Sequence, residues 1–349
     1  ITGACGYIGS TLSQYLEGKG MTITRYDKGY FHNCKLKSSL PEKFYHRKGV
    51  EDIIEDDLLD QDVVIHLAGI SNDPMGKMTK EQVYDPSRRY SVQLAKLCKS
   101  QGIKFIFASS CSIYGIAESG LVNEESQAIP QTDYSRNKLE IEEELRTIAG
   151  DGFSPVALRF ATVYGFSPRM RFDIVNNMLV GSAITSGKII LNSDGSSWRP
   201  NLYIKDLCKA VYRTIRVDIK GNLLTTMNIG DESNNSKIID LANLISRHTN
   251  APIKYLHQSH KEEADELVRD RKVSGRDNRT YSVSFERMRD ILGEDTCRTT
   301  LNEGIRELIL DLNDVQITSQ IFQDKSFYRL QFLESLLHRE QIDTSLNWI

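Results

Sequence analysis

The chain has 349 residues, of which 40% are hydrophobic and 26% charged, and its formal net charge at pH 7 is -3. This length and composition predict a globular protein of one large or two modest domains. The small net charge gives no reason to expect nucleic acid or an acidic membrane surface as a partner, and no apolar run approaches the ~18 residues of a membrane span.

Six cysteines are scattered along the chain without C-x-x-C spacing. This pattern predicts neither a metal site nor a disulfide framework, and it indicates a reducing, cytoplasmic environment. Ile1-Thr2 reads as the end of a strand, so we expect the natural protein to begin earlier.

A glycine-rich turn, Gly3-Ala4-Cys5-Gly6-Tyr7-Ile8-Gly9, joins that strand to a helix expected from Thr11 to Gly18. The glycine spacing permits a tight turn and close approach of a pyrophosphate to backbone N–H groups, so Gly3, Gly6, Tyr7, Ile8 and Gly9 are candidate cofactor-binding residues. The next strand, over 21–27, ends at Asp27. A carboxylate there accepts hydrogen bonds from the adenosine ribose and repels a 2′-phosphate, which predicts NAD rather than NADP. The alternative role for Asp27 is capping a turn.

An apolar segment over 62–69 predicts a buried parallel strand. Ser71, Asn72 and Asp73 follow it, at the end of a strand where open α/β sheets bind ligands. These three residues either reach the substrate or shape a turn.

The central motif lies further along the chain. A helix over 91–101 leads to an apolar strand over 105–108, then to Ser110, a loop over 118–133 and a helix carrying Tyr134 and Lys138. A Tyr and a Lys four residues apart share one helix face. A cation ~4 Å away at an effective dielectric of ~20 contributes ~4 kcal/mol, or roughly three pKa units, and thus brings a phenol towards the range of a general base. Ser110 would position the substrate oxygen.

The strand and helix alternation loosens after the strand over 153–160. We therefore predict a dinucleotide-binding domain over 1–166 and, over 167–349, mainly a substrate-binding domain with a helical tail, some of whose segments return to the first sheet. The tail carries large apolar residues at helical spacing over 327–337, and we expect it to pack on its own domain rather than form an independent module; the alternative is a surface for a partner.

These motifs in this order resemble the NAD-dependent epimerase/dehydratase family of extended short-chain dehydrogenase/reductases, from residue 1 to about residue 293. The resemblance implies an α/β fold, with a Rossmann-type doubly wound parallel sheet and a smaller C-terminal α/β substrate-binding domain. It also implies a nucleotide-sugar substrate, a possible homodimer, and catalytic roles for Ser110, Tyr134 and Lys138. Tyr134 and Lys138 would also hold the nicotinamide ribose, while the backbone of Leu67, Ala68 and Gly69 lines the cofactor.

Candidate substrate contacts come from the same resemblance. Thr162 stands where the family normally has Asn, and a hydroxyl replaces only part of an amide's hydrogen bonding. Arg199 and Arg279 match segments that face the nucleotide or its diphosphate, a task suited to a forked guanidinium. Arg169 and Arg171 are weaker candidates.

The reaction is predicted from Ser110-Cys111-Ser112. Family dehydratases carry Thr-Asp-Glu here, and the two acids remove the C5 proton and help expel the C6 hydroxyl. Serine has no useful acid–base range near neutrality, and Cys111 is expected to be buried and inert, with an acid/base role as the alternative. We therefore expect a 4-epimerase that oxidises the sugar transiently. A ketoreductase, a dehydratase and a catalytically inactive NAD-binding regulator remain alternatives.

Overall fold

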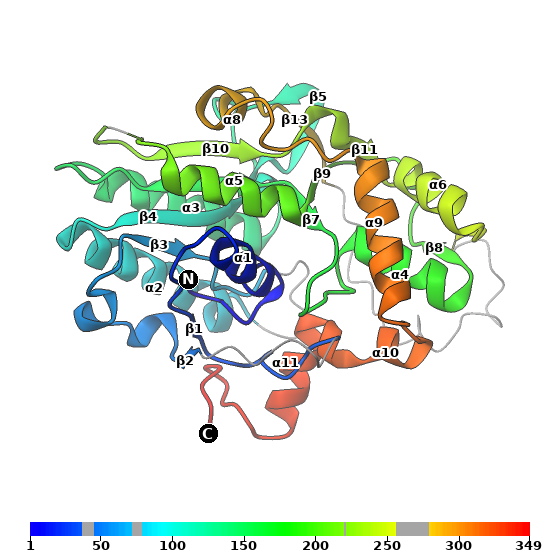
Figure 1. Ribbon diagram of the computed structural model, residues 1–349, viewed down its shortest axis with the longest axis horizontal. Helices are drawn as coiled ribbons and strands as arrows, with labels where there is room; N and C mark the ends of the chain where they lie inside the picture. Colours follow the sequence, from blue (N-terminus) through cyan, green and yellow to red (C-terminus); the bar gives the residue numbers. More distant parts are fainter. Residues whose placement is uncertain (37–44, 72–78, 220, 256–278) are drawn as a thin grey trace.

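The computed structural model describes residues 1–36, 45–71, 79–219, 221–255 and 279–349. Its central sheet is parallel, with β10 (Thr225–Ile229), β6 (Val156–Phe160), β4 (Lys104–Ser110) and β3 (Val63–His66) as neighbours in that order (Figure 1). Thr2 bridges in parallel to both His66 and Tyr26, and β1 (Tyr26–Asp27) pairs with β2 (His46–Arg47). The glycine-rich turn therefore leaves the middle of a doubly wound sheet, as predicted.

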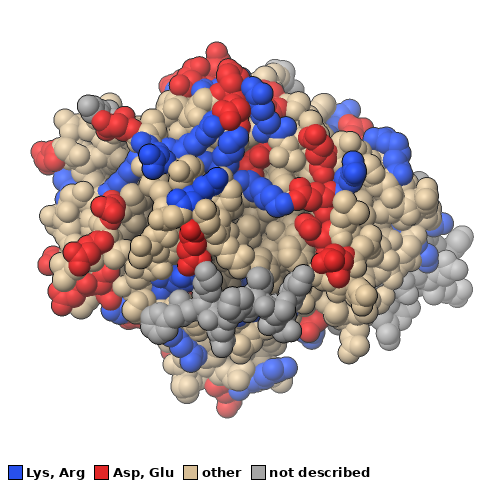
Figure 2. Space-filling view, viewed as in Figure 1, with Lys and Arg blue, Asp and Glu red and all other residues tan. Residues whose placement is uncertain are grey.

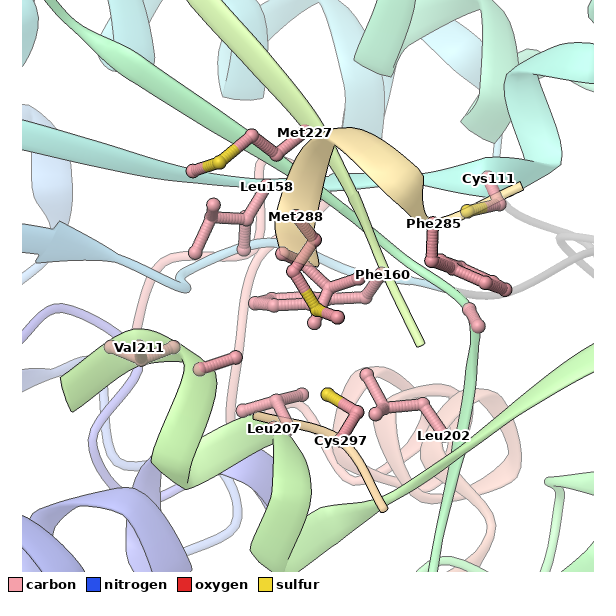
Figure 3. Packing of buried hydrophobic residues seen from close by; sticks show 14 of the residues in the cluster. Cys111, Leu158, Phe160, Leu202, Leu207, Val211, Met227, Phe285, Met288 and Cys297 are labelled. Atoms are coloured by element: carbon pink, nitrogen blue, oxygen red, sulfur yellow. The ribbon is translucent and has the colours of Figure 1, made fainter. Parts of the chain in front are cut away.

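Helices cover both faces of this sheet. Along each strand, alternate side chains point to opposite faces. One face packs against α1 (Tyr7–Glu17), α5 (Ile204–Arg216) and α8 (Glu286–Leu292), with Leu158, Phe160 and Met227 in its core (Figure 3). The other packs against α2 (Lys80–Ser100) and α3 (Asp133–Ile148), with Phe105 and Phe107 in its core.

A second region of the fold, apart from the central sheet and the helices that cover it, consists of small sheets and further helices. β7 (Thr162–Tyr164), β9 (Trp198–Tyr203) and β11 (Asn235–Lys237) form one sheet. Two strand pairs complete this region: β8 (Ile189–Leu191) with β12 (Ile253–Tyr255), and β5 (Ile116–Val122) with β13 (Thr280–Val283). The helices α4 (Val175–Ser186), α6 (Ile238–Thr249), α9 (Leu301–Asp314) and α10 (Ser319–Gln323) share a separate core.

Several expected boundaries were wrong. The strands expected over 21–27, 62–69 and 153–160 are shorter, at Tyr26–Asp27, Val63–His66 and Val156–Phe160. α1 begins at Tyr7 rather than Thr11, so the glycines lead directly into the helix. α2 begins at Lys80 rather than Ser91, because Thr79 and Gln82 form a capping box and Pro86 is accommodated inside the helix. The loop expected over 118–133 includes most of β5, whose partner β13 is distant in sequence.

The position of the C-terminal tail corrects another expectation. Phe327 and Tyr328 pack with α4 and α9, in the region from which they come. However, α11 (Arg329–His338) and the residues after it pack on the N-terminal part of the chain, with the end of the tail beside β1 and β2 (Figure 1). Their apolar cluster comprises Phe31, Cys34, Val83, Tyr84, Leu333, Leu336, Ile342 and Leu346.

Figure 2 shows acidic and basic side chains interspersed on one face of the molecule, with Lys and Arg frequent over α5. Along that helix Lys205 pairs with Glu307, and Lys209 and Arg213 both pair with Asp295. This row of cations is therefore balanced by acids from elsewhere in the chain. None of the described helices is long and apolar enough to cross a membrane.

Candidate functional site

The glycine-rich turn is shaped by contacts that no larger residue permits. Gly3 has φ +72°, and a Cβ there would lie 2.8 Å from the backbone nitrogen of Ala68. A Cβ on Gly9 would lie 2.2 Å from the Gly3 carbonyl oxygen. α1 begins directly after Gly6 without a side-chain cap, so its first N–H groups and its dipole favour an anion. This geometry suits a phosphate held close to the backbone.

Asp27 ends β1 beside this turn. Its carboxylate accepts hydrogen bonds from the Cys5 N–H at 2.9 Å and the Gly29 N–H at 2.7 Å. Burial raises the pKa of Asp27, while these two N–H groups and the nearby charge of Arg329 oppose the rise. Asp27 therefore has the expected position, and it also fixes the glycine-rich turn to the strand.

The segment after β3 lies against the same turn. Leu67 N–H donates to the Thr2 carbonyl at 3.2 Å, and Ala68 N–H donates to the Thr2 hydroxyl at 3.4 Å. Gly69 follows with φ +152°. The Ser71 hydroxyl accepts from Arg171 at 3.1 Å and also from Arg329, and its contact with the substrate stays a prediction. Its predicted neighbours Asn72 and Asp73 lie outside the described residues.

The structure brings the three predicted catalytic residues to adjoining elements. Ser110 ends β4, and its hydroxyl accepts from the Ser112 N–H at 3.2 Å. Tyr134 and Lys138 lie on the first turns of α3, and the Lys138 Nζ is 5.8 Å from the centre of the Tyr134 ring. Lys138 also donates to the Ala108 carbonyl at 2.6 Å, which ties the helix to the strand that carries Ser110.

The surroundings of Lys138 set its charge. Its pKa falls to about 7, chiefly because it is buried; Glu142 on the next helical turn raises the pKa, and the charge of Arg329 lowers it further. Near neutral pH the ammonium and amine forms are thus both populated. The ability of Lys138 to favour a tyrosinate then depends on the charges that surround it.

A buried ion pair connects β6 to α3, the helix that carries Tyr134 and Lys138. The Arg159 Nη2 on β6 lies 2.7 Å from a carboxylate oxygen of Glu142 on α3. Glu142 also accepts from the Ser109 hydroxyl at 2.5 Å, and Arg159 donates to the Tyr114 hydroxyl at 2.9 Å. The pair therefore connects α3, β4, β6 and the loop that follows Ser110.

That loop, a short 3-10 helix over Cys111–Tyr114, contains no acid. Cys111 is 1% exposed, and its thiol donates to the Arg159 carbonyl at 3.0 Å. Burial raises the pKa of Cys111, and its side chain packs in the core near Phe285 (Figure 3). The expectation that Cys111 is buried is confirmed. Ser112 is buried as well, and its hydroxyl has no hydrogen-bond partner among the described residues.

Two of the predicted substrate residues, Thr162 and Arg199, lie on the sheet formed by β7, β9 and β11. Thr162 on β7 is in register with Asn201 on β9. Arg199, also on β9, is 8% exposed and donates to the Arg279 carbonyl. The structure therefore brings the two predicted arginines together, although one binds the other's backbone.

Sequence reasoning missed a buried arginine on the tail. Arg329 begins α11 and lies 8% exposed, close enough for its charge to affect both Asp27 and Lys138. Arg169 and Arg171, which ranked as weak candidates, are buried beside it. The helical spacing of Arg329, Leu333 and Leu336 was the available signal, because it places a cation on the apolar face.

These residues fit a dinucleotide. The glycine-rich turn and the start of α1 would hold its diphosphate, Asp27 the adenosine ribose, and Tyr134 with Lys138 the nicotinamide ribose. The guanidinium Nε atoms of Arg169 and Arg329 are buried and have no partner among the described residues, which is consistent with an anionic group nearby.

The model of the NAD dependent epimerase/dehydratase family matches residues 1–230. Among curated proteins, the chain is 30% identical over 179 residues to ADP-L-glycero-D-manno-heptose-6-epimerase of Thiobacillus denitrificans (strain ATCC 25259 / T1), covering 47% of this chain and 51% of that protein. It is 29% identical over 180 residues to UDP-glucose 4-epimerase of Azospirillum brasilense, covering 49% and 50%. The chain thus spans about half the length of these curated relatives.

Among solved structures, the NAD-dependent NDP-hexosamine 5,6-dehydratase TunA superposes with a TM-score of 0.76 at 22% identity, covering 90% of this chain and 97% of that one. At this identity the likeness shows the fold alone, which confirms the predicted α/β class. The family match covers most of the chain and includes the glycine-rich turn, Ser110, Tyr134 and Lys138. The chain belongs to the NAD dependent epimerase/dehydratase family, whose cofactor is NAD.

Proposed function

We propose that this protein is a nucleotide-sugar 4-epimerase. The observation that carries the proposal is the absence of an acid in the described loop Ser110–Tyr114, where Cys111 is buried with a raised pKa and Ser112 offers only a hydroxyl. Elimination of water requires a group that removes a carbon-bound proton and one that protonates the leaving hydroxyl. Epimerisation at C4 requires neither.

The roles of the residues follow from their positions. Tyr134 accepts the proton of the sugar C4 hydroxyl and returns it later, and Ser110 at the end of β4 orients that oxygen. Lys138 stabilises the tyrosinate when its side-chain amine is protonated and carries a positive charge. NAD, when bound, supplies the acceptor for the hydride that leaves C4 and returns to its other face.

The sheet formed by β7, β9 and β11 would hold the substrate. Thr162 is in register with Asn201 on β9, and Arg199 at the start of β9 contacts the backbone of Arg279; a guanidinium there is suited to the nucleotide or its diphosphate. The 4-keto sugar must turn within this site before it is reduced, so contacts to the nucleotide would anchor one end of the substrate while its sugar turns.

The proposal is tested by incubating the purified protein with a panel of nucleotide sugars in deuterated water and analysing the products by NMR. A 4-epimerase forms the C4 epimer without carbon-bound deuterium. Deuterium at C3 or C5, or loss of the C6 hydroxyl, would instead identify a 3,5-epimerase or a dehydratase. Consumption of external cofactor would identify a net ketoreductase, whereas bound NAD with no turnover of any sugar would identify an inactive binding protein.

A further inference from the structure

Three buried arginines lie in one region, two of them in contact with Ser71; we call Arg169, Arg171 and Arg329 the arginine cluster. Arg171 donates to the Ser71 hydroxyl at 3.1 Å and to its carbonyl at 3.3 Å, and Arg329 donates to the same hydroxyl. Arg169 and Arg329 both lie near the Phe31 ring, with guanidinium carbons 4.2 and 5.7 Å from its centre. Three cations thus occupy one small buried region.

The described residues give Arg169 and Arg329 only part of the hydrogen bonding that a buried guanidinium requires. Asp173 pairs with Arg171 at 2.8 Å and accepts from the backbone N–H of Arg329 at 3.3 Å. The side-chain Nε atoms of Arg169 and Arg329 have no hydrogen-bond partner in the described part of the chain. Burial and mutual repulsion lower the pKa of Arg169 to about 10 and that of Arg329 well below its usual value. A buried cation in this state is stabilised by an anion.

The location indicates which anion. Arg329 lies near enough to Asp27 and Lys138 for its charge to lower the pKa of both side chains. Asp27 is predicted to bind the adenosine ribose, and Lys138 is predicted to bind the nicotinamide ribose. Asn177 donates to the Tyr7 hydroxyl at 3.2 Å and to the Arg171 carbonyl at 3.0 Å, so Arg171 lies close to the first residue of α1. In a dinucleotide the diphosphate lies between the two riboses. The cluster therefore lies in the part of the site where that group belongs.

We propose that the arginine cluster binds the diphosphate of NAD together with the glycine-rich turn, and that Arg329 is supplied for this purpose by the C-terminal helix α11. The inference rests on the cofactor of the proposed function and not on the reaction at C4. Guanidinium groups suit the task because their planar N–H donors match phosphate oxygens.

The tail is fixed in a position that serves this role. Leu333 and Leu336 of α11 pack against Phe31 and Tyr84. Beyond the helix, the Trp348 ring N–H donates to the Lys28 carbonyl at 2.6 Å, directly after Asp27 in the chain. The tail is thus bound to the chain next to Asp27, on the adenosine side of the predicted cofactor site. It lies outside the region matched by the family model.

An anion at the cluster would also act on the catalytic lysine. The positive charge of Arg329 is one cause of the lowered pKa of Lys138. A bound diphosphate offsets that charge and so favours the ammonium form of Lys138, which is the form that stabilises a tyrosinate. Binding of the cofactor would in this way prepare the base.

The experiment compares Arg329→Gln and Arg329→Lys with Arg339→Gln, which removes the same charge from the exposed end of α11. Affinities of the full chain, freed of cofactor, are measured by calorimetry for NAD and ADP-ribose and by ligand-observed NMR for adenosine. Arg329→Gln should weaken NAD and ADP-ribose on the order of 10- to 100-fold, the loss typical of charge-assisted hydrogen bonds, and leave adenosine unchanged. Arg329→Lys should recover part of the loss, and Arg339→Gln should match the wild type.

Stability separates a ligand-binding role from a structural one. Because Arg329 is buried and its Nε has no hydrogen-bond partner among the described residues, Arg329→Gln should not lower the urea midpoint of the cofactor-free form. Unchanged NAD affinity, equal losses for adenosine and ADP-ribose, or a lower urea midpoint would each overturn the proposal. So would a defect confined to UDP or dTDP binding in the NAD-loaded protein, which would assign the cluster to the substrate. If the wild-type protein bound no dinucleotide, the cofactor assignment itself would fail.

Discussion

Tyr134 is the residue on which the proposed chemistry depends most. It lies one helical turn before Lys138, beside the end of β4. Replacing it by Phe removes the proton acceptor but keeps the ring that packs near Tyr84, with centroids 6.3 Å apart. Any loss of activity in Tyr134→Phe is therefore due to the missing phenolic oxygen.

We expect Tyr134→Phe to lower kcat by about 10²- to 10⁴-fold, the usual contribution of a general base, while NAD affinity changes little. Steady-state kinetics and calorimetric NAD titration measure the two quantities. Tyr90→Phe, on α2, serves as the control and should behave as the wild type. A Tyr134→Phe enzyme that kept most of its activity would show that another group is the base.

Lys138 gives the free protein a characteristic pH dependence. Its folded-state pKa is about 7, whereas an unfolded lysine titrates near ~10.4. Between these values the unfolded chain binds more protons than the folded one, so this residue makes the free energy of unfolding rise with pH, by up to about 1.4 kcal/mol per pH unit.

Urea unfolding of the cofactor-free protein at pH 7, 7.5, 8 and 8.5 measures this effect. Lys138→Met keeps the aliphatic volume but removes the titrating group, so the variant should lack the rise that Lys138 contributes. The difference in unfolding free energy between wild type and variant should change steadily in favour of the wild type. Parallel curves would mean that Lys138 is not titrating in this range.

Among the elements, α3 and β6 are connected by the ion pair of Glu142 and Arg159, next to the loop that follows Ser110. Removing one partner of a buried ion pair leaves the other charge uncompensated. Here the Arg159 guanidinium would keep its hydrogen bond to the Tyr114 hydroxyl, while the Ser109 hydroxyl, which donates to the Glu142 carboxylate, would lose its charged acceptor.

Glu142→Gln should therefore lower the free energy of unfolding by about 3–5 kcal/mol in urea denaturation. Glu143→Gln changes the neighbouring, exposed residue of the same helix and should cost little. Similar effects for the two variants would indicate that the buried pair contributes no more than a surface charge.

At the scale of the whole molecule, local signals predicted the parallel sheet and the motifs built on it. The glycine-rich turn, Asp27, Ser110 and the Tyr134 helix are each encoded within a few residues, and the fixed order of a doubly wound sheet arranges them. Boundaries were less predictable, since the start of α2 depends on the Thr79 capping box rather than on the apolar pattern.

Contacts between distant segments could not be predicted. β5 is a strand because β13 pairs with it, and the sequence of residues 116–122 does not predict that partner. Likewise the apolar spacing of α11 predicts a buried face but not that Phe31 and Tyr84 receive it. The arginine cluster follows from that placement, since Arg329 is far from Arg169 and Arg171 in sequence.

The central claim is that hydride leaves C4 of a nucleotide sugar and returns to the same carbon. The most direct measurement uses a substrate labelled with deuterium at C4, with the position of the label in the product determined by NMR and mass spectrometry. The account predicts that the product is the C4 epimer and that the deuterium remains at C4. Deuterium at C6 would indicate a dehydratase, and deuterium released to free cofactor would indicate net oxidation; either result would contradict the account.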